Sequence, residues 1–262
     1  MWETLSRLWG GHGAQATAPA VSALREVAGR YPFLAGLSGE EFARLQSLVA
    51  HFLREKSIHG AAGLELDDAM RLHIAVQACL PILNLDIAYY RGWVEVIVYP
   101  DEFLPEIEWT DDHGVVHRSR EVRAGEAWLG GPVILSWADV APLGAGDGVN
   151  VVIHEFAHKL DMLNGEADGF PPLHRDMSRA QWSEAFREAY EDFRRRVDAD
   201  EETDIDPYAA EDPAEFFAVM SEAFFEIPQA VAAEYPRVYE QLARFYRQDP
   251  RARHRVPGGA IE

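Results

Sequence analysis

The alternation of apolar and polar positions predicts that the chain begins with helices. Apolar residues recur at helical spacing over 38–52, where Ser38 and Glu41 form a capping-box pattern at the start. A second helix is predicted over 66–81, because two aspartates precede an apolar periodic run there. Residues 56–64, between these helices, fit a short strand or a loop.

The period changes in the middle of the chain. The segment 93–100 alternates and is rich in β-branched residues, and 131–137 (GPVILSW) has similar character, so each predicts a strand. Between them the sequence predicts a hairpin around 111–114. A loop over 138–150 follows, and the next apolar periodic run predicts a helix over 150–163.

The last third of the chain returns to helical spacing. Three further helices are predicted, over 181–197, 213–225 and 237–246. The first 20 residues, rich in Gly and Ala, and the residues after Asp249 are expected to be poorly ordered.

The composition limits the classes of function. The chain has 262 residues, 24 basic and 44 acidic, and its net charge of −20 argues against binding to nucleic acid. Cys79 is the single cysteine, so no intrachain disulfide can form. The sequence has no run of 18 apolar residues and no signal-peptide pattern at its start, so we expect a cytoplasmic protein without a membrane span.

The run HEFAH within the helix predicted over 150–163 is the strongest chemical signal. His154 and His158 lie four residues apart, which places both imidazoles on one helix face where they can bind one zinc ion. Glu155, beside the first histidine, can act as the general base that takes a proton from the attacking water. This pattern predicts a zinc-dependent peptidase.

A catalytic zinc site needs a third protein ligand and an open position for water. Asp161 follows His154 by seven residues on the same helix face, and it can instead accept a hydrogen bond from an imidazole. The predicted helix 213–225 is so apolar that a carboxylate on it calls for a partner or a metal. The residues alone leave five candidates for the third ligand open: Asp161, Asp168, His174, Glu215 and Glu222.

Longer stretches of the chain carry a resemblance. HEFAHKLDMLNGEADGFP, IDPYAAEDPAEFFAVMSEAFFEIP and YPRVYEQLARFYRQDP resemble the Mlc titration factor A family of bacterial zinc peptidases. WVEVIVYPDEF and GPVILSW resemble it as well, so the similarity covers most of the chain. The spacing of the tyrosine and glutamate in the second stretch is also similar to the catalytic domain of anthrax lethal factor.

The resemblance implies roles for particular residues. It implies a gluzincin-type site with Glu215 as the third zinc ligand and Tyr208 as a hydrogen-bond donor to the reacting oxyanion. Glu222 matches the family pattern too, in a supporting role. The resemblance further implies aminopeptidase-like activity on peptides and binding to the glucose-responsive repressor Mlc.

The expected fold is α+β and zincin-like. We predict one domain with two lobes, in which a small, mostly antiparallel sheet lies against the HExxH helix. Its parts are a helical section over 20–90, the sheet and zinc helix over 91–165, a helical section over 166–250, and a tail over 251–262. The strand 131–137 is a candidate edge for an extended peptide, with Gly131 and Val133 as substrate-binding residues. The competing hypothesis is a non-catalytic regulator that binds the repressor and uses zinc structurally.

Overall fold

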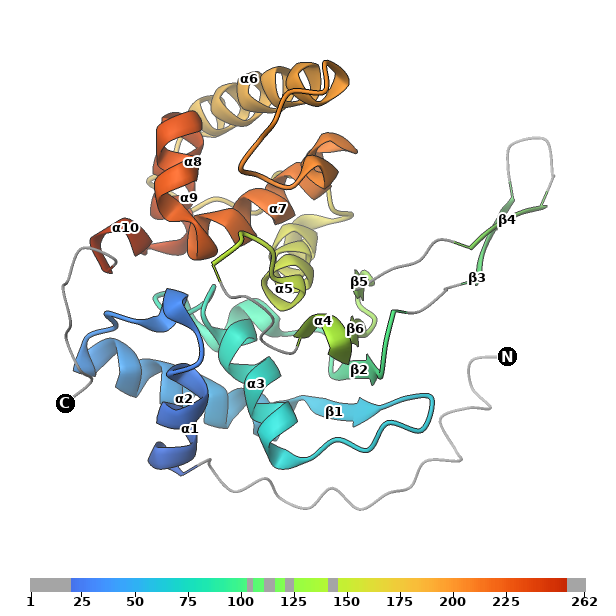
Figure 1. The fold of residues 1–262 in the computed structure, drawn as a ribbon, viewed down its shortest axis with the longest axis vertical. Helices are drawn as coiled ribbons and strands as arrows, with labels where there is room; N and C mark the ends of the chain where they lie inside the picture. Colours follow the sequence, from blue (N-terminus) through green and yellow to red (C-terminus); the bar gives the residue numbers. More distant parts are fainter. Residues whose placement is uncertain (1–19, 103–105, 111–115, 121–124, 141–145, 254–262) are drawn as a thin grey trace.

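The arrangement of the helices places one helix, α5, at the centre of the molecule. A computed structural model describes residues 20–102, 106–110, 116–120, 125–140 and 146–253. In Figure 1 the N-terminal helices lie on one side of α5, the C-terminal helices lie on the other, and the sheet lies beside it. The predicted α+β class is therefore confirmed.

The N-terminal part is helical, as predicted. Its elements are α1 (Val21–Ala28), η2 (Pro32–Leu34), α2 (Gly39–Glu55), α3 (Asp68–Cys79) and η3 (Ile87–Tyr90). The capping box is confirmed, because the Ser38 hydroxyl accepts a hydrogen bond from the Glu41 backbone N–H at 3.2 Å. In return, the Glu41 carboxylate accepts from the Ser38 N–H at 2.9 Å.

The main sheet has four strands in the order β1–β2–β6–β5. These strands are β1 (Ser57–Gly60), β2 (Glu95–Tyr99), β5 (Gly125–Ala127) and β6 (Val133–Ser136). β1 pairs with β2 and β2 with β6 in parallel, whereas β5 and β6 are antiparallel. The prediction of a mostly antiparallel sheet is wrong: the sheet is mixed, because long segments separate the parallel strands and return the chain to the same end.

The position of β6 within this sheet also corrects an expectation. β6 pairs on both sides, with β2 and with β5. The strand 131–137 is therefore no edge strand, and among the described strands β5 ends this side of the sheet. The apolar run at 133–136 is typical of a strand buried in the core.

A separate hairpin and a short helix complete the middle of the chain. β3 (Glu106–Thr110) and β4 (Val116–Arg120) pair antiparallel, and the predicted turn at 111–114 lies outside the described residues. The prediction of a loop over 138–150 is partly wrong, because its first residues belong to the short helix α4 (Trp137–Val140).

The C-terminal part consists of helices that cover α5 (Val151–Asp161). They are η4 (Met162–Asn164), α6 (Arg179–Asp198), η5 (Pro207–Ala210), α7 (Pro213–Glu226), α8 (Pro228–Glu234), α9 (Pro236–Tyr246) and α10 (Pro250–Arg253). The frayed end expected after Asp249 is wrong as far as α10 extends, because Arg253 is buried and donates a hydrogen bond to Glu41 at 3.0 Å. Residues 254–262 lie outside the described part, as do residues 1–19 at the other end.

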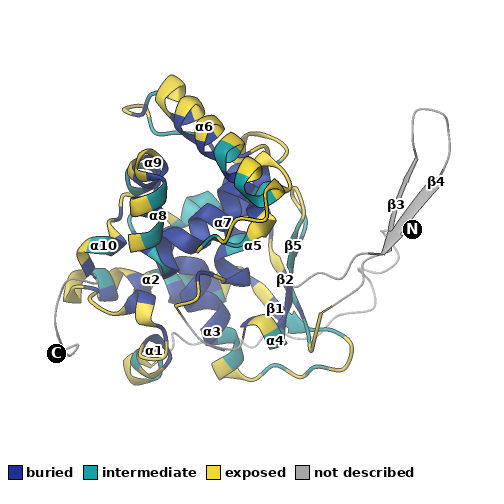
Figure 2. Cartoon of the chain, turned by 45° about the horizontal axis from the view of Figure 1, so that its top comes forward, coloured by how far each residue is buried: buried dark blue, intermediate teal, exposed yellow. Residues whose placement is uncertain are grey.

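The core surrounds α5 and α7. Figure 2 shows both helices as largely buried, between exposed outer faces of the surrounding helices. Val152, Ile153 and Phe156 of α5 are fully buried, and so are Phe217 and Phe224 of α7. No helix in the described ranges is long and apolar enough to cross a membrane. The largely buried helices α5 and α7 also carry the histidines and glutamates of the site described next.

Candidate metal centre

The helix α5 begins at a strong cap and presents two histidines on one face. Asn150 is its N-cap, and the side-chain oxygen of Asn150 accepts a hydrogen bond from Ile153 N–H at 2.9 Å. His154 and His158 follow one turn apart, and their Nε2 atoms lie 3.1 Å from each other. The two imidazole nitrogens also share a partner.

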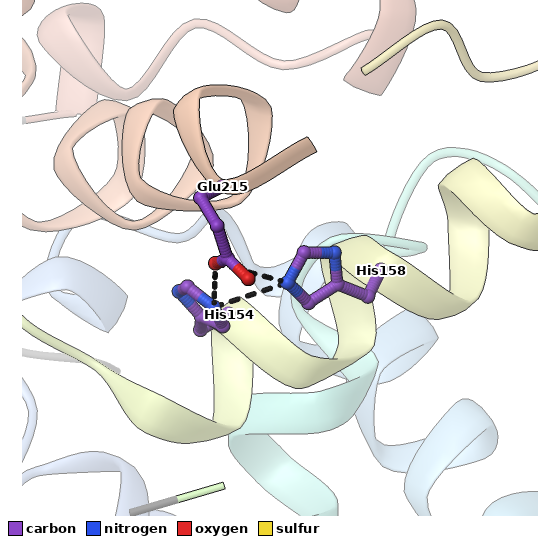
Figure 3. Close-up of side chains that lie close together, drawn as sticks. All are labelled: His154, His158 and Glu215. Atoms are coloured by element: carbon purple, nitrogen blue, oxygen red, sulfur yellow. Dashed lines mark hydrogen bonds and ion pairs between the residues drawn. The ribbon is translucent and has the colours of Figure 1, made fainter. Parts of the chain in front are cut away.

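That partner is the Glu215 carboxylate, which reaches across from α7. Its Oε2 lies 3.0 Å from Nε2 of His154 and 3.3 Å from Nε2 of His158. Figure 3 shows Glu215 extending from α7 toward both imidazoles of α5. Among the described residues, these three form a group that could hold a metal ion.

The spacing of the three atoms suits a small tetrahedral cation. Bonds of about 2.0–2.1 Å in tetrahedral geometry separate ligand atoms by about 3.3–3.4 Å. The three observed separations are 3.0, 3.1 and 3.3 Å, close to that value. Two imidazoles and a carboxylate are also ligands that divalent transition metals prefer. The residues present therefore fit a bound metal ion.

The charges at this group also favour a bound cation. Burial by itself lowers the pKa of His154, but the carboxylates of Glu222 and Glu215 outweigh it and raise that pKa well above its usual value. Burial raises the pKa of Glu215, yet its hydrogen bonds to the two imidazoles hold it below its usual range. An arrangement that retains a proton between these atoms also favours a cation there.

A second carboxylate of α7 fixes the orientation of the first histidine. Glu222, one of the candidates for the third ligand, lies behind His154, and its Oε1 is 2.7 Å from Nδ1. The other oxygen of Glu222 accepts from the backbone N–H of Asn150. A carboxylate on the far nitrogen of a metal-binding imidazole sets the ring orientation and tautomer.

Asn150 extends this polar contact to α3 and to a second glutamate of α7. Its side-chain amide donates to Gln77 on α3 at 2.8 Å and to Glu226 on α7 at 2.9 Å. Glu226 also accepts from the backbone N–H of Gly146 at 3.0 Å. No role for Asn150, Gln77 or Glu226 was predicted from the sequence. The signal available in the sequence was an Asn immediately before the apolar periodic run of α5.

Glu155 lies beside the metal group in a buried position. Its side chain is 4% exposed, and burial raises its pKa to about 7 against the opposing effect of His154 and His158. A side chain at Gly125 on β5 would overlap the Glu155 carboxylate, so the strand backbone passes directly next to it. This close approach gives Gly125 a role that the sequence analysis missed.

Tyr208 lies on η5, close to the first histidine. Its ring centroid is 6.1 Å from that of His154, and the residue is 47% exposed. The partly exposed tyrosine therefore lies near the first histidine of the metal group, seven residues before Glu215 in the sequence.

The other three candidates for the third ligand have different partners. His174 Nε2 lies 2.8 Å from the carbonyl oxygen of Phe245. Asp168 accepts a hydrogen bond from Phe170 N–H at 2.9 Å within its own loop. Asp161 is fully buried and accepts two backbone N–H groups through Oδ2. None of these three joins His154 and His158 in the structure.

The residues expected to bind substrate lie at the start of β6 and in the turn before it. Val133 is fully buried and belongs to the core, so its side chain faces away from solvent. Gly131 lies in the turn itself, and its carbonyl oxygen accepts from the Lys159 ammonium at 2.8 Å. Lys159 follows His158 on α5, so the turn is fastened to the same helix that carries the histidines.

Two histidines one turn apart, a glutamate from a second helix and a buried carboxylate beside them define a metallopeptidase-like protein. Comparison with known families agrees with this class. The chain belongs to the glucose-regulated metallo-peptidase M90 family, whose model matches residues 11–247.

Several relatives match most of the chain. The protein Mlc titration factor A of Salmonella gallinarum is 44% identical over 230 residues, which is 86% of this chain and 86% of the relative. Proteins of the same name from Salmonella paratyphi B and Salmonella typhimurium are 43% identical over the same shares. The family resemblance found in the sequence is thereby confirmed.

Proposed function

We propose that this protein is a zinc-dependent, aminopeptidase-like peptidase of the cytoplasm. The observation that carries the proposal is the meeting of His154, His158 and Glu215 within bonding reach of one small cation, with Glu155 buried beside them. When bound, zinc would lower the pKa of a coordinated water and polarise the scissile carbonyl.

The side chains of the protein divide the remaining work. Glu155 accepts the proton of the attacking water and passes it to the leaving amine. The Tyr208 hydroxyl donates a hydrogen bond to the oxygen that becomes negative in the tetrahedral intermediate. Glu222 holds the ring of His154, and Asn150 holds Glu222. A site with only a structural zinc ion would have no use for a buried carboxylate at position 155.

The substrate is an extended peptide that pairs with β5. This strand ends its side of the main sheet among the described strands, and Gly125 brings its backbone against Glu155. Backbone pairing to a sheet edge binds peptides with little dependence on their sequence. Peptide binding, which was expected at the strand 131–137, is therefore proposed for β5, the antiparallel neighbour of β6.

The name of the relatives supports a second property. They are called Mlc titration factor A, and by similarity we propose that this protein also binds a repressor of the Mlc type. That contact is made between proteins and needs no surface for nucleic acid. The alternative is a regulator that binds the repressor without hydrolysing peptides.

One variant separates these two functions. Glu155→Gln keeps the size of the side chain and leaves all three ligand side chains intact. We expect it to lower kcat for an amino-acid p-nitroanilide by about 10²–10⁴-fold, with zinc content and binding to purified Mlc unchanged. Hydrolysis at the wild-type rate would refute the mechanism, and absence of hydrolysis by the zinc-loaded wild type would favour the regulator.

A further inference from the structure

Asp161, the last residue of α5, is a buried carboxylate that the mechanism does not use. It is fully buried, and its Oδ2 accepts hydrogen bonds from two successive backbone N–H groups, those of Asp168 at 2.9 Å and Gly169 at 2.7 Å. Two adjacent amides that converge on one carboxylate oxygen form a strong, charge-assisted contact. The contact closes the loop 162–169 back onto the end of α5.

Gly169 connects that loop to the start of α7. It has a φ of +77°, and a Cβ atom there would overlap the carbonyl oxygen of Pro213, the first residue of α7. From the other side, the buried indole of Trp182 donates to the Gly169 carbonyl at 3.3 Å. The backbone at Gly169 is therefore held between α5, α6 and the first residue of α7.

Glu215 is two residues beyond this contact, in the first turn of α7. Asp212 caps that turn and accepts the backbone N–H groups of Ala214 at 2.7 Å and Glu215 at 2.9 Å. A displacement of Pro213 would therefore move Glu215 with it. The hydrogen bonds of Asp161 to the 168–169 backbone therefore influence, through Gly169 and Pro213, the distance between the two histidines and Glu215.

The second oxygen of Asp161, Oδ1, and one ring nitrogen of His158, Nδ1, are both buried without a hydrogen-bond partner among the described residues. The two residues are three apart, on one face of α5, and a side chain at the later position leans toward the earlier one. Metal-bound imidazoles usually donate their second N–H to a carboxylate or carbonyl oxygen.

We propose that Asp161 is the positioning residue that joins the two halves of the metal site. Through Oδ2 it fixes the 168–169 backbone and hence Pro213 and Glu215. Through Oδ1 it accepts the Nδ1–H of His158 when the metal is bound, as Glu222 does for His154. This inference rests on the metal site of the proposed function but not on peptide hydrolysis.

The first test compares substitutions of Asp161 and of Asp168, whose backbone N–H Asp161 accepts. Asp161→Asn keeps the shape of the side chain and removes its charge, while Asp168→Asn alters a carboxylate that, among the described residues, accepts from Phe170 N–H alone. Zinc affinity, measured by competition with a chelating dye, should fall about 10–100-fold in Asp161→Asn and stay at the wild-type value in Asp168→Asn. The visible spectrum of bound Co²⁺ should change in the first variant alone.

The outcomes of this test are distinct. Wild-type zinc affinity and cobalt spectrum in folded Asp161→Asn protein would overturn the proposal, and so would equal losses in both variants. The unfolding temperature of the metal-free proteins shows whether each is folded. If zinc affinity falls as expected but no peptide is hydrolysed by the wild type, the positioning role stands and the peptidase proposal fails.

A second pair of variants tests the backbone path and leaves Asp161 untouched. Gly169 and Gly165 lie in the same loop and both have positive φ, but a Cβ at Gly165 would meet no atom. Gly169→Ala should lower zinc affinity by displacing Pro213, whereas Gly165→Ala carries backbone strain alone and should keep it. Equal zinc affinity in these two variants would contradict the path from Gly169 to Glu215, and this pair decides the question if Asp161→Asn does not fold.

Discussion

The helix α5 and the first turn of α7 supply the same candidate metal site in different ways. In α5 the two histidines are placed by local geometry, since any helix brings residues four apart onto one face. Glu215 in α7 comes 57 residues after His158 and depends on how the two helices are held together. The long-range contact of Glu222 with His154 supplies part of that connection, and the proposed path from Asp161 through the 168–169 backbone supplies the rest. A short motif therefore prepares half of the site, and tertiary packing must complete it.

Removal of the metal has the largest expected effect and separates the two regions directly. Treatment with a chelator should abolish peptide hydrolysis, and free zinc should restore it. Relative to protein at a free zinc concentration about 1,000 times Kd, the metal-free protein should have a free energy of unfolding lower by about 4 kcal/mol. Hydrogen exchange measured by mass spectrometry should accelerate at residues 213–216 of α7 more than at 152–158 of α5. Equal acceleration in both segments would break the comparison.

The hydroxyl of Tyr208 tests a region that belongs to neither helix. Tyr208→Phe should lower kcat by about 10²–10³-fold, because loss of one donor to an oxyanion has that size of effect. Zinc affinity should stay unchanged, since the ring stands beside His154 without joining the metal group. A loss of zinc in this variant would make Tyr208 part of the metal site.

Asn150→Ala should destabilise the protein by about 3 kcal/mol. The change removes a helix cap and leaves the buried partners Gln77 and Glu226 without their shared amide donor. Its measurement is urea unfolding of the metal-free protein. A loss below about 1 kcal/mol would mean that the cap alone, and not the buried network, accounts for the effect.

Asp212→Ala removes the N-cap of α7, as Asn150→Ala removes the N-cap of α5. Of these changes it has the smallest expected effect on stability. It should cost about 1 kcal/mol, because Asp212 caps two backbone N–H groups and no buried side chain depends on it in the contacts described. Zinc affinity should nonetheless fall relative to wild type, since the turn that carries Glu215 becomes less ordered. Unchanged zinc affinity would show that the first turn of α7 is fixed without its cap.

The sequence predicted the helices well where signals are local. Ser38 with Glu41 marked the start of α2, and helical spacing of apolar residues marked α5 and α7. These signals depend on residues within one or two turns of each other. They do not require knowledge of what the helix packs against.

The sheet was predicted less well because strand pairing is a long-range property. The apolar runs of β2 and β6 indicate strands, but nothing within them says that the two are parallel neighbours. The run GPVILSW could equally belong to an edge or to a buried strand, and Val133 lies in the core. The polar partners of the site were missed for the same reason, since Gln77 meets Asn150 only after folding.

The central claim is that one metal ion joins α5 to α7 through three side chains. Anomalous X-ray diffraction from crystals of zinc-loaded protein, recorded at the zinc absorption edge, tests it most directly. The account predicts one zinc peak at about 2.0–2.2 Å from His154 Nε2, His158 Nε2 and a Glu215 oxygen. A peak bound by the histidines without Glu215, or bound directly by Glu222 or Asp161, would contradict it.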